Sequence, residues 1–182
     1  MRLTSQLVNV IMNCISSSVL NILYIWNGEP TKTFKPTRGI RQGDPLSLYI
    51  FVACKERLSQ LIEAKVAEGK WKAFPLTRGG TRLSHLMFAD DVILFGEASV
   101  EQARIVNTCL QEFCAASGQK VSSQKSNIFF SPNTNDAVMA GVCNILAIPQ
   151  TEDPGIIWES QQLVDGSRRP LIKASLEKWT NN

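Results

Sequence analysis

Two adjacent carboxylates, Asp90 and Asp91, are the residues of this 182-residue chain whose types and spacing most directly suggest chemistry. Four apolar residues precede them and four follow, at 86–89 and 92–95. Such flanks predict two short buried strands joined by a tight turn, a β-hairpin with the aspartates at its tip. Carboxylates about 4 Å apart repel each other, and a divalent cation that prefers oxygen ligands, Mg²⁺ or Mn²⁺, removes this repulsion. The pair therefore suggests phosphoryl or nucleotidyl transfer.

An exposed turn is the alternative for this stretch, with both aspartates serving only as turn formers. Two features favour a functional site instead. The turn lacks the glycine that two-residue hairpin loops prefer, and its flanks are apolar throughout rather than alternating. A second motif is needed to choose between the two interpretations.

That motif lies upstream, where residues 38–47 read Arg-Gly-Ile-Arg-Gln-Gly-Asp-Pro-Leu-Ser. Together with Phe88-Ala89-Asp90-Asp91 it resembles the reverse transcriptases of non-LTR, LINE-like retrotransposons. The similarity continues through residues 118–121 and 125–126, so it covers roughly residues 1–131. The family's glycine-x-x-glutamine-glycine-x-proline-x-serine signature is matched by Gly39, Gln42, Gly43, Pro45 and Ser47.

The resemblance implies roles for individual residues. Asp90 would be the principal metal ligand and Asp91 the secondary one, while Phe88 and Ala89 would shape the floor under the primer end. Lys120 is the candidate for assisting the pyrophosphate leaving group, with an ordinary solvated lysine as the alternative. The nucleotide and template pocket would take residues of the glycine motif, namely Arg38, Gly39, Arg41, Gln42 and Gly43.

The implied two-metal site for Mg²⁺ or Mn²⁺ is incomplete in this chain. The family places an additional aspartate on a strand before the glycine motif, yet the only carboxylate before Arg38 is Glu29, in a predicted turn. Two metal ions that clamp the attacking and leaving oxygens need ligands from both strands. We therefore expect the chain to begin inside the polymerase palm and to be inactive alone.

The implied fold is α+β, a partial polymerase palm in which an antiparallel sheet with the catalytic hairpin is flanked by helices. Asp44 is expected to cap the helix that starts at Pro45, rather than to bind metal. Val19–Trp26 and Thr31–Phe34 are predicted to pair as a hairpin around Asn27-Gly28. Apolar spacing and capping residues predict five helices. They cover Ser5–Ile15, Pro45 to about Glu68, a helix that begins with a capping box at Ser99 and ends at Ser117, Asp136–Ile148 and Arg168–Trp179.

Composition and charge narrow the class of protein. The chain is 44% hydrophobic and 19% charged, typical of a soluble globular domain rather than a disordered or membrane protein. Residues 32–82 carry 11 basic and 4 acidic side chains, a net charge of +7. Such a segment could hold a phosphate backbone, although a solvated helix face is the alternative. Trp71 and Phe74 within it could contact nucleic acid or simply anchor their loop.

The remaining composition suggests an intracellular protein. Five cysteines without a Cys-x-x-Cys pair predict mostly buried, reduced thiols. The only histidine, His85, is expected to be structural, and no transmembrane span is predicted. A nuclear location follows from the family resemblance alone.

Residues 1–131 are thus interpreted as a partial fingers and palm region, and residues 132–182 as a thumb- or connector-like tail in which the resemblance decays. The leading hypothesis is a fragment of an RNA-directed DNA polymerase that extends a primer 3′-hydroxyl. Its partners would be an RNA template, a DNA primer, deoxynucleoside triphosphates and the missing N-terminal part of the same element, with no membrane. The alternatives are a non-catalytic nucleic-acid-binding remnant and an unproductive translation product that cannot complete its core.

Overall fold

The computed structural model describes residues 4–16, 25–26, 29–30, 45–75, 80–88, 91–152 and 171–177, in a chain that divides into two compact units. The first unit comprises Met1–Phe51 and Trp179–Asn182. It contains helix α1 (Ser5–Ser16), as predicted, and a short antiparallel pair, β1 (Ile25–Trp26) with β2 (Glu29–Pro30). This pairing confirms that strands meet on either side of residues 27–28. The expected partner strand at 31–34 lies outside the described residues.

Helix α2 (Pro45–Ala67) begins in the first unit and continues into the second, which comprises Val52–Lys178. Its end agrees with the prediction, because Gly69 follows with a left-handed φ of 71° that glycine adopts without strain. Leu58 and Ile62 are fully buried on the predicted apolar stripe. Asp44, the predicted cap, lies outside the described residues.

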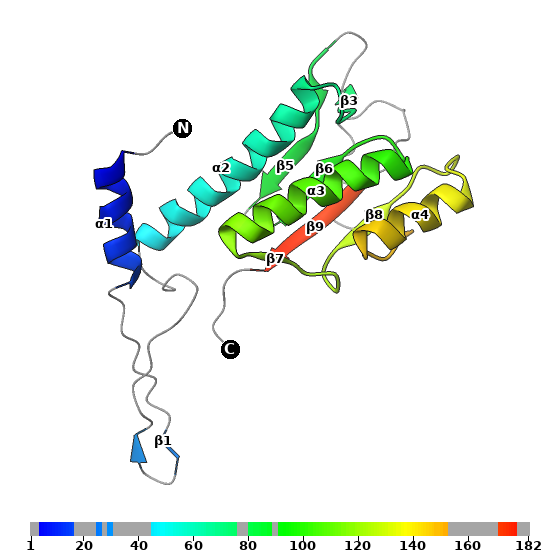
Figure 1. Ribbon diagram of the computed structural model, residues 1–182. Helices are drawn as coiled ribbons and strands as arrows, with labels where there is room; N and C mark the ends of the chain where they lie inside the picture. The colour runs from blue at the N-terminus through cyan, green and yellow to red at the C-terminus, as the bar shows by residue number, and fades with distance from the viewer. Residues whose placement is uncertain are drawn as a thin grey trace. The chain divides into compact units, whose positions relative to one another are not determined.

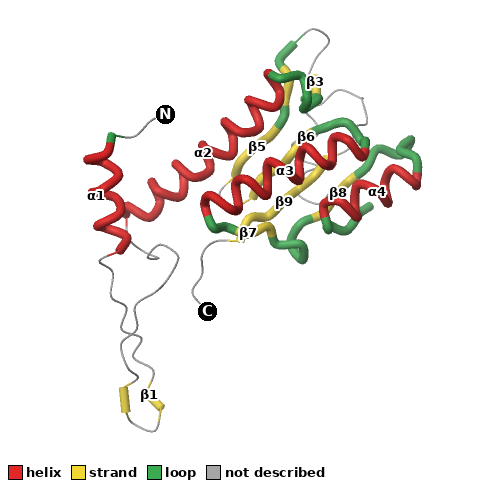
Figure 2. The backbone as a smooth tube through the Cα atoms, viewed as in Figure 1, coloured by secondary structure: helices red, strands yellow, loops and turns green. Residues whose placement is uncertain are grey.

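An antiparallel five-stranded sheet forms the base of the second unit (Figures 1 and 2). Strand β5 (His85–Phe88) pairs with β6 (Asp91–Phe95), and β6 pairs with β9 (Leu171–Glu177). On its other side β9 pairs with β7 (Lys120–Val121) and β8 (Asn127–Phe129). The last strand in sequence is therefore a central strand in space.

The helix predicted over Arg168–Trp179 is therefore wrong, because Leu171–Glu177 forms strand β9. The segment is short, and its apolar residues are compatible with both the helical repeat of about 3.6 residues and the strand repeat of about two residues. Pairing with β6 on one side and with β7 and β8 on the other satisfies backbone groups that a helix would have satisfied internally. Tertiary pairing has overridden the local preference.

Three helices cover one face of the sheet: α2, α3 (Val100–Ser117) and α4 (Asp136–Leu146) (Figure 1). From β6, Val92 and Leu94 enter this core and are 0% and 1% exposed. Ile93 is on the opposite face, since side chains alternate along a strand. There it packs with Phe95 and with Phe74 from the ribbon of β3 (Phe74–Pro75) and β4 (Arg82–Leu83). The α+β class is confirmed.

Helix α3 begins and ends as its sequence predicts. The Ser99 side chain accepts a hydrogen bond from the Gln102 backbone N–H at 3.1 Å, and Gly118 ends the helix with a φ of 69°. The capping box is only half formed, however, because the Gln102 side-chain oxygen accepts from the Lys72 backbone N–H at 2.8 Å. Helix α4 ends at Leu146, two residues before the predicted end at Ile148. The next residue, Ala147, adopts a left-handed φ of 54°.

Trp71 anchors the loop after α2 rather than presenting its ring to solvent. It is 2% exposed, and its indole Nε1–H donates to the Phe95 carbonyl at 2.8 Å. Phe74 is likewise buried, against Phe95. Of the two roles considered for these aromatic residues, anchoring is the one confirmed.

The described cysteines, Cys54, Cys109, Cys114 and Cys143, are free thiols, as predicted, but the expectation that most of them are buried is wrong. Only Cys109 is fully buried, and its desolvation raises the pKa to about 11. Its thiol is therefore protonated and unreactive at neutral pH. In the part of the chain that the structure describes, no helix is long and apolar enough to cross a membrane.

Candidate functional site

The predicted hairpin is present, with Asp91 as the first residue of β6 and Phe88 as its partner on β5. Ala89 and Asp90 lie outside the described residues. The expectation that both strands are buried is wrong for β5, where Leu86 is 41% and Phe88 82% exposed. The reason is that side chains alternate along a strand, and Leu86 and Phe88 are opposite Ile93 and Asp91, on the face of the sheet that the helices do not cover.

Asp91 belongs to the face of the sheet that the helices leave open. It alternates with Val92, which faces the helices, and shares its own face with Ile93. Phe88, directly opposite Asp91, is on the same face and highly exposed. A partly exposed carboxylate and an exposed aromatic ring thus lie side by side at this end of the hairpin.

Lys120 is on the same face as Asp91, across strand β9. Register places Ser175 opposite Asp91 and Glu177 opposite Lys120, and these two positions of β9 are two residues apart. Two strand spacings separate β6 from β7, about 10 Å across the sheet. Lys120 is exposed there. The sheet therefore brings the two candidates to one face without direct contact between them.

Lys55 is a feature of the site that sequence reasoning missed. This residue of α2 is only 6% exposed, and its Nζ donates to the Asp91 carbonyl oxygen at 3.4 Å. The signal was present in the sequence, since Lys55 precedes Leu58 and Ile62 at helical spacing on the buried stripe. A lysine on such a stripe marks a position where a charged group enters the core.

One turn after Lys55, polar contacts attach α2 to the hairpin again. Ser59 Oγ lies 3.7 Å from the Met87 sulfur and 3.0 Å from His85 Nε2. The other ring nitrogen of His85, Nδ1, lies 2.9 Å from Ser84 Oγ. These contacts give His85 a structural role, as predicted.

We expect His85 to make stability depend on pH. Burial lowers its pKa below the ordinary 6.5, although Glu63 and Glu56 partly oppose this. A depressed folded-state pKa means that the stabilising contribution is present above the unfolded pKa and is lost as pH falls through the folded one. The melting temperature should therefore fall between about pH 7.5 and pH 5 more steeply in the wild type than in His85→Gln. Equal pH slopes would contradict this assignment.

The donor chemistry at the hairpin tip fits Mg²⁺ or Mn²⁺ only in part. The Asp91 carboxylate offers the hard oxygen atoms that these ions prefer. Among the described residues, however, no three His, Cys, Asp or Glu side chains gather closely enough to hold a metal ion. The Lys55 ammonium also lies at the carbonyl of this same aspartate. The described residues therefore do not form a complete metal site.

The predicted nucleotide and template pocket is not described. Its residues lie outside the described ranges, and only Pro45 and Ser47 of the glycine motif appear, in the first turn of α2. The pocket remains a prediction for Arg38, Gly39, Arg41, Gln42 and Gly43.

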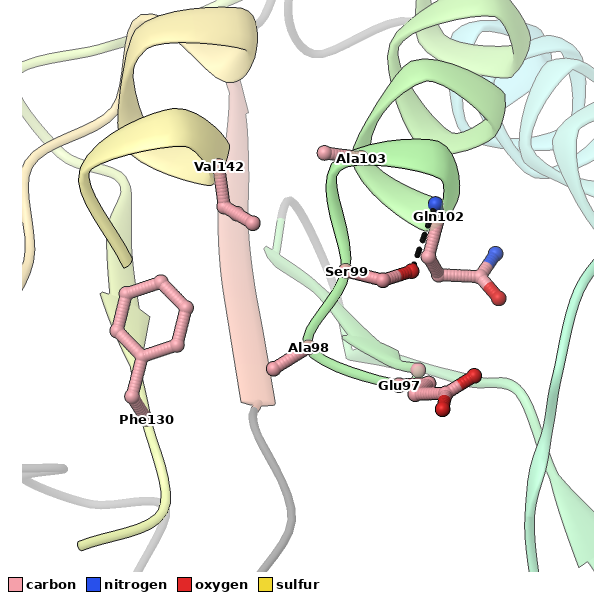
Figure 3. A pocket seen from close by; sticks show the side chains of 8 residues that line it. Glu97, Ala98, Ser99, Gln102, Ala103, Phe130 and Val142 are labelled. Atoms are coloured by element: carbon pink, nitrogen blue, oxygen red, sulfur yellow. Dashed lines mark hydrogen bonds between the residues drawn. The ribbon is translucent and has the colours of Figure 1, made fainter. Parts of the chain in front are cut away.

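A small hollow between the start of α3 and helix α4 does not offer an alternative site. Figure 3 shows Phe130 and Val142 on one side and Ala98 and Ala103 on the other. Glu97, at its edge, forms an ion pair with Lys72. Because its walls are mainly apolar, we interpret this hollow as a packing defect.

Comparison with known proteins places the chain in context. The family model described as reverse transcriptase (RNA-dependent DNA polymerase) matches residues 2–162. An uncharacterized mitochondrial protein of Arabidopsis thaliana is 43% identical over 70 residues, covering 38% of this chain and 57% of that protein. A retrovirus-related Pol polyprotein from a type-2 retrotransposable element of Drosophila melanogaster is 27% identical over 99 residues, covering 54% of this chain and 8% of the polyprotein. No solved structure matches the chain.

Proposed function

Because the chain belongs to the reverse transcriptase family, we propose that it is part of an RNA-directed DNA polymerase from a non-LTR, LINE-like retrotransposon. The retrotransposable element among its relatives supports this origin. The observation that carries the proposal is the β5–β6 hairpin, which starts β6 with Asp91 on the open face of the sheet. An antiparallel sheet with helices on one face and this aspartate on the other is consistent with a polymerase palm.

The proposed reaction is template-directed transfer of a nucleotide to a primer 3′-hydroxyl, with RNA template, DNA primer and deoxynucleoside triphosphate as substrates. Bound Mg²⁺ or Mn²⁺ would neutralise phosphate charge and activate the hydroxyl. Asp90 and Asp91 would hold this metal. Phe88 would support the primer end, and the exposed Lys120 would assist departure of pyrophosphate.

We further propose that this chain does not extend a primer alone. The strand beside β6 is β9, and its residue opposite Asp91 is Ser175, a residue type without a carboxylate. This register supports the proposal that a ligand comes from another segment of a longer product. Residues 32–82, with their net charge of +7, support nucleic-acid binding as the second candidate function.

Metal titration tests the proposed role of the aspartates. We expect saturable Mn²⁺ binding by calorimetry in the wild type and its loss in Asp90→Ala/Asp91→Ala, because the replacement removes both carboxylates. Circular dichroism would verify that the double variant is folded. A double variant that binds Mn²⁺ as the wild type does would contradict the proposal.

Binding to an RNA–DNA hybrid separates the two candidate functions. Salt-dependent binding without aspartate-dependent Mn²⁺ binding would favour the non-catalytic remnant. Primer extension by the purified chain on an RNA template would contradict its proposed inactivity.

A further inference from the structure

Strand β5 has one paired edge and one free edge in the described part of the chain, where β6 is its only partner strand. The Phe95 backbone N–H donates to the Ser84 carbonyl at 2.8 Å, so these two residues form a hydrogen-bonded pair of the ladder. Such pairs alternate along an antiparallel ladder, and Leu86 is therefore also bonded to β6. The backbone N–H and C=O groups of His85 and Met87 point the other way, to the free edge of β5.

The open side of this free edge is apolar. Leu86 is 41% and Phe88 82% exposed, on the face of the sheet that the helices do not cover. Soluble proteins commonly protect a free edge with lysine, proline or a bulge. Strand β5, with the sequence His-Leu-Met-Phe in regular register, has none of these. The free edge is therefore accessible to a further strand, whose apolar side chains would cover this surface.

The helix side of the same free edge is acidic. Ser59 Oγ of α2 lies 3.0 Å from His85 Nε2, and Glu56 and Glu63 lie about one helical turn before and after Ser59. Burial lowers the His85 pKa, and both exposed carboxylates partly oppose this, so their charge acts at the edge. Among the described residues, neither glutamate forms an ion pair. Two negative charges without ion-pair partners thus border the free edge.

We propose that β5 accepts an additional antiparallel strand from an extended peptide segment in which basic residues alternate with apolar ones. Directly opposite residues of an antiparallel pair have their side chains on one face. Residues that bond to His85 and Met87 therefore have side chains on the helix side, where Glu56 and Glu63 favour lysine or arginine. The intervening residues lie on the open side, beside Leu86. Backbone bonds would supply affinity and the alternation would supply specificity.

Fluorescence anisotropy of the full-length chain with a labelled peptide tests the proposal. The probe alternates valine with lysine, and a control peptide of the same composition groups its lysines at one end. We expect saturable binding of the alternating peptide and binding of the grouped peptide that is weaker by about fivefold or more. Glu56→Gln/Glu63→Gln should weaken binding of the alternating peptide about fivefold, because it removes both opposite charges. Glu101→Gln/Glu112→Gln makes the same charge change at exposed positions of α3 and should leave the affinity unchanged.

Backbone methylation of the peptide tests the strand geometry. Methyl groups on the lysine amides remove the donors that face β5 and should abolish binding. Methyl groups on the valine amides point away from β5 and should leave binding intact. Binding of the unmethylated peptide should slow hydrogen exchange of the His85 and Met87 amides by about tenfold or more, as read by nuclear magnetic resonance. The Leu86 amide, already bonded to β6, is the internal control.

Several outcomes would overturn the inference. One is equal binding of the two methylated peptides, and another is binding that leaves the His85 and Met87 amides unprotected. Equal affinity of the wild type and Glu56→Gln/Glu63→Gln is a third. Failure of the alternating peptide to bind also overturns it, and a dimer in sedimentation with both amides protected would show that a second copy occupies the edge instead. Metal binding by the aspartates is independent of these outcomes, so the proposed function is tested separately.

Discussion

A chain that ends at Pro170 is expected to lose cooperative unfolding of its second unit. Residues 171–177 form the strand β9, which pairs with β6 on one side and with β7 and β8 on the other. Its removal would leave the backbone groups of three strands without these partners and would open the edge of β6 beside the apolar core. Thermal unfolding followed by circular dichroism should become broad, and a dye that binds exposed apolar surface should bind the truncated chain.

Two comparisons separate this effect from simple shortening. A chain ending at Lys178 retains all of β9 and should unfold cooperatively, as the wild type does. Ala174→Pro, in full-length protein, removes one backbone donor from the central strand opposite Val92 and should reduce the free energy of unfolding by about 1–3 kcal/mol. Cooperative melting of the chain ending at Pro170, at the wild-type temperature, would show that β9 contributes little to the sheet.

Trp71→Ala is expected to reduce the free energy of unfolding by about 3–5 kcal/mol. The indole is 2% exposed and belongs to the main core cluster with Leu58 and Ile62. Its removal would leave a cavity and would take away the donor to the Phe95 carbonyl, which is 2.8 Å from Nε1. Urea denaturation followed by far-ultraviolet circular dichroism would measure the loss.

Trp71→Phe divides this effect into its parts, because it keeps most of the apolar volume and removes only the hydrogen-bond donor. We expect a smaller loss, about 1–3 kcal/mol. Tyr49→Ala is a matched surface control, since Tyr49 is 73% exposed and its replacement should change stability by about 0.5 kcal/mol or less. A loss below about 1 kcal/mol in Trp71→Ala would contradict the anchoring role assigned to this residue.

The sequence alone determined the features that depend on neighbouring residues. Ser99 and Gly118 bound helix α3 because a hydroxyl accepts the orphan N–H of the first turn and glycine tolerates a left-handed φ. The Phe88–Asp91 hairpin was likewise predictable, because two apolar runs flank a polar turn. The two motifs also predicted the reverse transcriptase family correctly, since they combine residue types and spacing that the chain itself carries.

Tertiary structure decided what depends on partners distant in the chain. Leu171–Glu177 is a strand because β6, β7 and β8 supply its hydrogen bonds, and no local pattern reveals those partners. Phe88 is exposed because it is opposite Asp91, on the face of the sheet that the helices do not cover. Lys55 meets Asp91 because α2 packs on the hairpin, across 36 residues of sequence. In each case the residue's surroundings, and hence its burial and charge environment, come from a contact that only the folded chain creates.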